Sequence, residues 1–110
     1  MIDHSKYRYH HLGIPTEIRH DGEQHLAEHK VFVSGYDKSE FGIEWMRYEN
    51  GCNLPEIVKT VPHVAFEVPN LEEAIRGKHI IISPNSPAEG VRVAFIVENG
   101  APIEFLEITK

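Results

Sequence analysis

The 110-residue sequence predicts an α+β domain that is built from two matching halves. Two observations lead to this prediction. The second half of the chain reads in the order strand, helix, strand, strand, strand, and the first half repeats that order in shortened form. In addition, two short motifs recur in the same order in both halves. A repeat of this kind indicates one domain made of two βαβββ modules.

The second half has the clearer pattern. Apolar residues alternate along 62–68 (PHVAFEV), which is typical of a half-buried strand. Asn70 and Glu73 have the spacing of a capping box, so a helix is expected to start there and to end at Gly77. Apolar patterns predict the remaining strands at 79–83, 91–97 and 103–108, with a loop at 84–90 and a hairpin turn at Asn99-Gly100.

The first half is shorter and more polar. Strands are expected at 11–14, 31–34 and 41–48. Because residues 15–30 hold few large apolar side chains, the helix of this half is expected to be short or missing. The predicted organisation is a single domain over residues 1–110, with module one at about 7–50, a linker at about 51–61 and module two at about 62–110.

The repeat aligns two pairs of tetrapeptides. HLGI at 11–14 matches HVAF at 63–66, and IEWM at 43–46 matches IEFL at 103–106. His11 and Glu44 are 33 residues apart, whereas His63 and Glu104 are 41 residues apart. The difference is roughly two helical turns, as the loss of most of one helix would produce.

Each half therefore supplies one His and one Glu from matching strand positions. Alternation places His11, His63, Glu44 and Glu104 opposite the residues that pack on the helices, so all four are expected on the concave side of the sheet. Imidazole and carboxylate ligands suit one divalent metal ion, either Zn, Ni, Co, Fe or Mn. Taken singly, each residue also fits a solvated or hydrogen-bonded role; the repeat favours a shared metal site.

Arg92 is a candidate substrate-binding residue. It shares a face of its strand with Ala94 and Ile96, and we expect that face to be the cupped side. A guanidinium there can bind a substrate carboxylate or phosphate in a bidentate fork. The alternative is a salt bridge to Glu104 or Glu67.

The other candidate residues have weaker patterns. Tyr36 and Tyr48 are possible pocket walls that bind substrate, or packing residues. His10 should point to the face opposite His11 and have a structural role. His25 and His29 are four residues apart, which fits a second metal site or, in the favoured interpretation, a solvated polar face.

Composition limits the partners. The formal net charge of −6 argues against nucleic acid and anionic membranes, which require clustered Lys and Arg. The polar N-terminal segment contains no apolar stretch for secretion, so a cytoplasmic location is expected. A single cysteine, Cys52, permits no internal disulfide. A domain this small would gain buried surface by pairing, which favours a homodimer.

The paired HLGI/HVAF and IEWM/IEFL strands resemble those of the vicinal oxygen chelate superfamily, which includes glyoxalases, bleomycin-resistance proteins and dioxygenases. The resemblance covers nearly the whole chain, and PHVAFEVPNLEEA is its most typical part. It implies a cupped eight-stranded mixed sheet of two βαβββ modules. It also implies that the metal ligands are His11, Glu44, His63 and Glu104, a set similar to that of bacterial glyoxalase I.

The resemblance implies a metal-dependent lyase or isomerase of the glyoxalase-like type. The expected substrate is a small 2-oxo or 2-hydroxy compound, neutral or anionic, that chelates the metal through adjacent oxygens. Glu44 or Glu104 would leave the metal and act as general base. The alternatives are an Fe(II) dioxygenase, for which Glu44 would be dispensable, and a non-catalytic protein that binds a small molecule without a metal.

Overall fold

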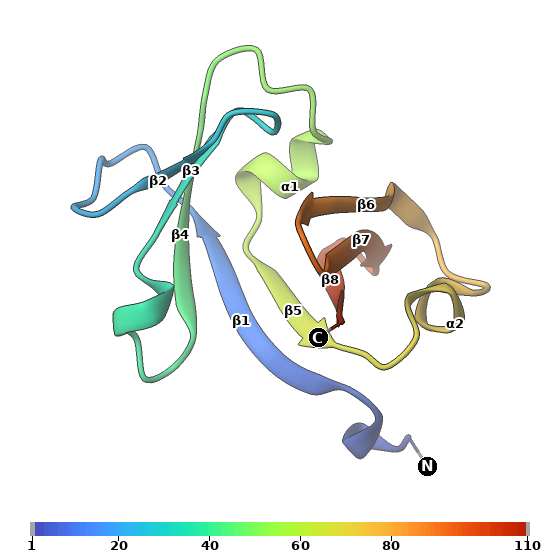
Figure 1. Ribbon diagram of the computed structural model, residues 1–110. Helices are drawn as coiled ribbons and strands as arrows, with labels where there is room; N and C mark the ends of the chain where they lie inside the picture. Colours follow the sequence, from blue (N-terminus) through green and yellow to red (C-terminus); the bar gives the residue numbers. More distant parts are fainter. Residues whose placement is uncertain (1, 110) are drawn as a thin grey trace.

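The computed structural model describes residues 2–109, whose strands form one eight-stranded mixed sheet in the order β2-β3-β4-β1-β5-β8-β7-β6 (Figure 1). The sheet curls into a half-barrel, which confirms the predicted α+β fold. The first half contains η1 (His4–Lys6), β1 (Arg8–Pro15), β2 (Gln24–Leu26), β3 (Val31–Ser34), η2 (Tyr36–Lys38) and β4 (Ile43–Tyr48). The second half contains α1 (Glu56–Thr60), β5 (His63–Glu67), α2 (Leu71–Ile75), β6 (Ile80–Ala88), β7 (Val91–Glu98) and β8 (Ala101–Ile108).

The two halves have the same strand pairing. In the first half β1 pairs in parallel with β4, and in the second half β5 pairs in parallel with β8. The registers also correspond, because Leu12 lies opposite Ile43 and Val64 lies opposite Ile103. The halves join through β1 and β5, which run antiparallel in the middle of the sheet. The tetrapeptides that the repeat aligned are therefore the parts of the sheet where the halves are most alike.

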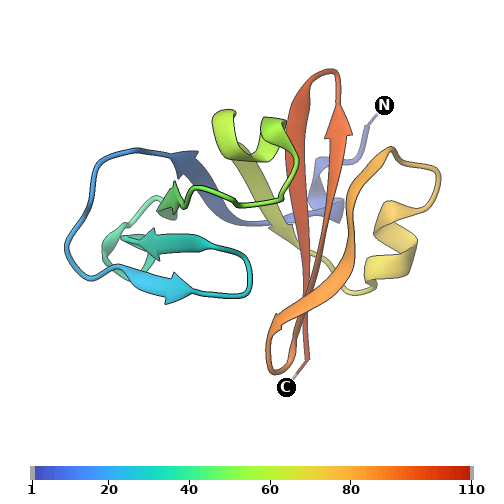
Figure 2. The ribbon, with the colours of Figure 1, turned by 90° about the horizontal axis from the view of Figure 1, so that it is seen from above.

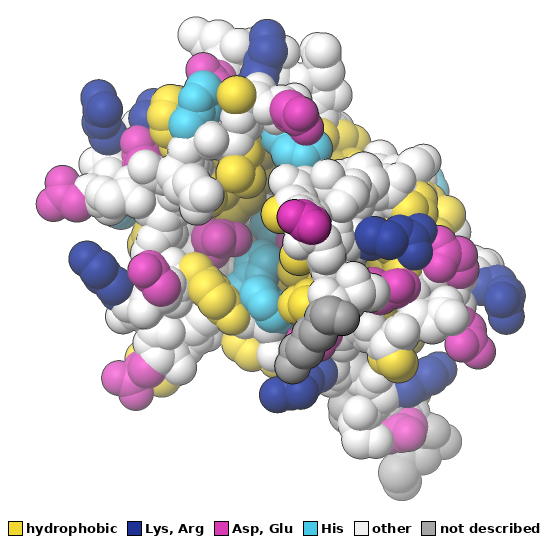
Figure 3. Space-filling view, viewed as in Figure 1, with side chains coloured by type: hydrophobic (Ala, Val, Ile, Leu, Met, Phe, Trp, Pro, Cys, Tyr) yellow, Lys and Arg dark blue, Asp and Glu magenta, His cyan; other side chains and the backbone are white. Residues whose placement is uncertain are grey.

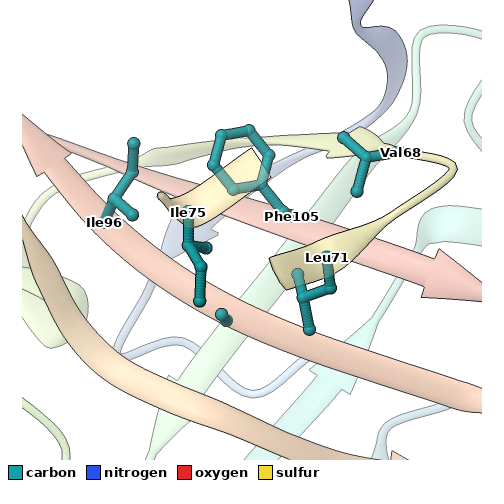
Figure 4. Packing of buried hydrophobic residues seen from close by; sticks show 6 residues of the cluster. Val68, Leu71, Ile75, Ile96 and Phe105 are labelled. Carbon is teal, nitrogen blue, oxygen red and sulfur yellow. The ribbon is translucent and has the colours of Figure 1, made fainter. Parts of the chain in front are cut away.

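The second half holds the main hydrophobic core. The helix α2 begins at Asn70, whose side-chain oxygen accepts a hydrogen bond from the backbone N–H of Glu73 at 2.9 Å, as the capping box predicts. This helix packs on the outer face of β7 and β8, on the side of the second half that faces away from the first (Figure 2). The buried core under it consists of Val68, Leu71, Ile75, Ala94, Ile96 and Phe105 (Figure 4).

The first half has no equivalent helix between β1 and β2 in the described chain; residues 16–23 form a loop there. Two polar side chains of this loop cover the outer face of β4 instead. The His20 ring stacks on Trp45 with a centroid distance of 5.0 Å. Glu23 accepts hydrogen bonds from Arg47 at 2.7 and 2.8 Å. The outer face of this half is thus covered by polar contacts rather than by an apolar helix.

Three elements differ from the sequence prediction. The strand β6 continues to Ala88 through the predicted 84–90 loop, since an edge strand tolerates Pro84 and Pro87 where its register shifts. The predicted linker contains a short helix, α1, whose Val58 is buried. The sequence also did not predict the strand β2, which has only three residues and lies in a polar segment. Within residues 2–109, no helix is long and apolar enough to span a bilayer.

Candidate metal centre

The site lies where the four central strands meet. Across the antiparallel pair β1–β5, His11 lies opposite Ala65 and His63 lies opposite Gly13. Across the parallel pairs, Glu44 lies opposite Gly13 and Glu104 lies opposite Ala65. Residues that lie opposite each other share a face of the sheet. The register therefore brings both histidines and both glutamates to one face, as the sequence predicted.

The smallest side chain in the site makes room for an imidazole. A Cβ atom at residue 13 would lie 2.2 Å from Cε1 of His63, so the His63 ring occupies the space above Gly13. On its other side this ring meets Phe95 edge-on, with a centroid distance of 5.0 Å. Packing between Gly13 and Phe95 thus fixes the orientation of His63.

Three of the four predicted ligands form a compact buried cluster. Oε1 of Glu104 lies 3.1 Å from Nε2 of His63 and 3.2 Å from Nε2 of His11. These three residues are 9%, 1% and 5% exposed, respectively, and their ligand atoms all lie within 4.8 Å of one another. The fourth, Glu44, lies 3.5 Å from His11 and is more exposed than Glu104. It stands beside the cluster rather than in it.

The cluster fits a divalent metal ion. Two atoms that bind one ion at about 2.1 Å lie roughly 3.0–3.4 Å apart when the angle between them is about 90–110°. The two shortest separations in the cluster fall in that range. Two imidazoles and a carboxylate are also ligands that suit Zn, Ni, Co or Fe. His11, His63 and Glu104 can therefore hold a metal, with Glu44 next to it.

The electrostatics of the cluster favour a cation. Burial raises the pKa of Glu104, but hydrogen bonds and the charges of His63 and His11 outweigh it and lower that pKa to about 2. Burial lowers the pKa of His11, while the hydrogen bond and charge of Glu104 leave it raised overall. Burial raises the pKa of Glu44. A metal must displace the proton that His11 shares with Glu104, so metal binding is expected to weaken at low pH.

A cavity of about 220 Å³ opens beside the cluster. His11, Glu44 and Glu104 line one end of it, and Figure 3 shows histidine and acidic side chains at the bottom of a hollow with apolar surroundings. Its walls are mostly apolar and come from both halves: Leu26, Val31, Val33, Met46, Leu54, Val58, Ile82, Pro87, Val91, Val93, Phe95 and Leu106. No Lys or Arg among residues 2–109 lines it.

Arg92 does not reach this cavity. Its guanidinium bonds to Glu72 of α2 and lies 3.6 Å from Glu107, on the outer face of the sheet. The prediction that Arg92 lies on the cupped side is wrong, because Phe95 lies opposite Glu104 and so Val91, Val93 and Phe95 form the cupped face of β7. Both faces of this strand carry apolar residues, and alternation alone does not say which faces inward.

The remaining candidates are divided between the cavity and its rim. Tyr48 lines the cavity, and burial raises the pKa of its hydroxyl. Tyr36 lies outside the cavity and stacks on His10. His29 lines the cavity, which the sequence analysis missed, whereas His25 bonds to Glu49 at 2.6 Å.

His10 is the largest correction at the site. It was expected on the face opposite His11, but it lines the same cavity, and Nδ1 of His10 lies 2.8 Å from Nδ1 of His11. The register of β1 against β5 shifts between Tyr9 and His11, so the alternation of side chains breaks at His10. No signal in the sequence marks this irregularity.

No protein-family model matches the sequence, and no curated protein matches it. Solved structures of similar fold include the following two. A hypothetical protein from Bacillus halodurans is 22% identical with a TM-score of 0.72, and the match covers 94% of this chain and 96% of that one. Methylmalonyl-CoA epimerase from Mycobacterium tuberculosis is 16% identical with a TM-score of 0.67, and the match covers 100% of this chain and 94% of that one. At these identities the likeness shows the fold alone.

Proposed function

We propose that this protein is a vicinal oxygen chelate enzyme, a metal-dependent isomerase or lyase that moves a proton at a carbon next to a carbonyl. One observation carries the proposal: a buried His11–His63–Glu104 cluster, with Glu44 held beside it, lies at the end of an apolar cavity. The similarity of the fold to that of an epimerase supports an isomerase over the other activities.

The proposed roles follow from the geometry. Lewis-acid polarisation of the substrate carbonyl is the chemistry that a bound divalent metal supplies. Glu104 faces both histidines at close range, so its role is to hold the metal. Glu44 lines the cavity and approaches only His11, at 3.5 Å. It is therefore the proposed general base, which takes the proton from the substrate carbon and returns it.

The cavity limits the substrate. Its volume of about 220 Å³ is below the roughly 300–1,000 Å³ of sites for drug-sized ligands. Because no Lys or Arg of residues 2–109 lines it, a second anionic group on the substrate would have no permanently charged partner there. We therefore propose a 2-oxo or 2-hydroxy compound with a small apolar body, whose adjacent oxygens are the chelating group. The phosphates of a coenzyme A ester would find no Lys or Arg partner in this cavity.

The first part of the test is metal content. Wild-type protein without a His tag, supplied with Zn, Ni or Co and then desalted, should retain one ion per chain by plasma mass spectrometry. His63→Ala should abolish retention, because His63 belongs to the cluster. His25→Ala is the matched control and should retain the ion, since His25 bonds to Glu49 outside the cluster. A wild-type protein that retains no metal would favour the non-catalytic binding protein.

The second part measures proton transfer without oxygen. Metal-loaded protein in deuterated buffer should exchange the carbon-bound proton next to the carbonyl of 2-oxo acids with small aliphatic side chains, followed by NMR. Glu44→Gln should lower the exchange rate about 10²–10⁴-fold, the usual scale for the loss of a general base. Glu49→Gln, the control, should exchange like the wild type. A reaction that consumes oxygen and survives Glu44→Gln would instead identify a dioxygenase.

A further inference from the structure

The irregularity in β1 brings two neighbouring histidines to the same side. Tyr9 lies opposite Phe66 and His11 lies opposite Ala65, so His10 is the extra residue at the register shift. In a regular strand, His10 and His11 would point to opposite faces. At this shift both rings line the cavity, and their Nδ1 atoms lie 2.8 Å apart.

A contact of this length between two ring nitrogens is a hydrogen bond, with one proton between them. If His10 donates, Nδ1 of His11 is the acceptor and Nε2 of His11 must carry the remaining proton. If His10 accepts, the proton is on Nδ1 of His11, and Nε2 is free to bind a metal beside Glu104. Only the second arrangement lets neutral His11 act as a ligand through Nε2.

The His10 ring is itself held in place. It stacks on Tyr36 with a centroid distance of 5.1 Å and an angle of 4° between the rings. His63 has no comparable partner: its Nδ1 is buried without a hydrogen bond among the described residues, and Gly13 and Phe95 orient the ring by packing. The two histidine ligands are thus oriented by different means.

We propose that His10 is a positioning residue of the metal site. Its Nδ1 accepts a hydrogen bond from the Nδ1–H of His11, and this bond fixes the ring orientation and the tautomer with which His11 binds the metal. The inference rests on the proposed metal site. Partners of this kind on a metal-bound histidine typically change metal affinity by about 10–100-fold. In most proteins the acceptor for the second ring N–H of a metal-bound histidine is a carboxylate, a backbone carbonyl or water. Here the acceptor would be an imidazole that stacks on a tyrosine.

The first test compares Co²⁺ affinity, read from the absorbance of the bound ion. His10→Phe preserves an aromatic ring on Tyr36 but lacks an acceptor, so it should bind Co²⁺ about 10–100-fold more weakly than the wild type. His10→Asn places an amide oxygen near the position of Nδ1 and should recover most of the loss. His25→Phe, at a histidine that bonds to Glu49 outside the cavity, should leave the affinity unchanged. Wild-type affinity in His10→Phe, or equal losses in His10→Phe and His10→Asn, would overturn the proposal.

The second test separates this proposal from the proposed function. In ¹⁵N-labelled, Zn-loaded protein, the ring-nitrogen shifts of His11 should show a protonated Nδ1, and His10→Phe should alter them while His25→Phe should not. In metal-free protein, a coupling between the two Nδ1 nuclei should appear across the hydrogen bond. If the wild type binds no Co²⁺, the proposed metal function fails, and absence of this coupling overturns the His10–His11 hydrogen bond separately. If His10→Phe does not fold, His10→Ala also lacks an acceptor and gives the same test.

Discussion

The two halves have matching strands but different outer faces. In the second half, α2 covers the sheet and encloses Leu71, Ile75 and Phe105 in the main core. In the first half, the loop at 16–23 places His20 on Trp45 and Glu23 on Arg47. One half is therefore closed by apolar packing, and the other by a ring stack and an ion pair.

The functional side of the sheet does not follow this difference. His11 and His63 occupy equivalent positions, as do Glu44 and Glu104, because the β1–β4 and β5–β8 registers are the same. The positions of the candidate ligands depend on strand register, which survives without the helix. The first half thus needs only its strands to deliver His11 and Glu44, while the second half supplies most of the buried apolar core.

The largest expected effect is on the free energy of unfolding, and it distinguishes the outer faces of the two halves. Phe105 and Trp45 are equivalent in the repeat, but Phe105 is 3% exposed beneath α2, whereas Trp45 is only partly buried. Phe105→Ala should lower the free energy of unfolding by about 3–5 kcal/mol, the usual cost of emptying an aromatic core position. Trp45→Ala should cost about 1–2 kcal/mol, because partial burial yields only part of the transfer free energy. Urea unfolding measures both, and equal losses would contradict the contrast between the halves.

Much of the sheet was predictable because the repeat shows which residues of the two halves occupy equivalent positions in the strand pairs. Aligning HLGI with HVAF and IEWM with IEFL gave the equivalent positions that the structure pairs across β1–β4 and β5–β8. The turn at Asn99-Gly100 was also predicted, and both of its residues have the positive φ that this hairpin requires. That turn contained the information to place Arg92: a two-residue hairpin there sets Phe95 opposite Glu104 and Arg92 opposite Glu107.

Other features had no local signal. The position of His10 depends on a register shift between β1 and β5, which involves residues far apart in the sequence. The path of β6 through Pro84 and Pro87 depends on its position at the edge of the sheet. Composition predicts a loop at 84–90, but β6 continues to Ala88 there. The homodimer and the cytoplasmic location stay predictions.

A smaller effect, on metal affinity, is expected at one of the two small residues that lie opposite the histidines. Gly13→Ala puts a Cβ about where the His63 ring lies, so that ring must move and metal affinity should fall at least about tenfold, equivalent to about 1.4 kcal/mol. Ala65→Gly, opposite His11, removes a methyl group and should keep the affinity, at a cost in stability of about 0.5–1 kcal/mol. Zn²⁺ titration calorimetry compares the two. Equal affinities in both variants would show that Gly13 does not position His63.

The smallest expected effect tests whether the polar cover of the first half depends on pH. Hydrogen bonds from Arg47 lower the pKa of Glu23 to about 2, from an ordinary value of 4.5. A carboxyl whose pKa is lower in the folded state adds stability above its unfolded pKa and loses it as pH falls toward its folded pKa. Hydrogen exchange of β4 amides should therefore be faster in Glu23→Gln than in the wild type at pH 6, after correction for intrinsic rates.

That difference should shrink as the pH falls from about 4.5 toward 2, because protonation of Glu23 then removes the ion pair in the wild type as well. Amides of β8, which lie over the apolar core under α2, should show little of this dependence. Glu56→Gln is the control. Glu56 is exposed, and its carboxylate lies 3.7 Å from the amine of Lys59, which makes a weak surface ion pair. A Glu23→Gln effect of equal size in β4 and β8 would mean that the ion pair stabilises the whole sheet. The polar cover would then not be local to the first half, and the two halves would unfold as one unit.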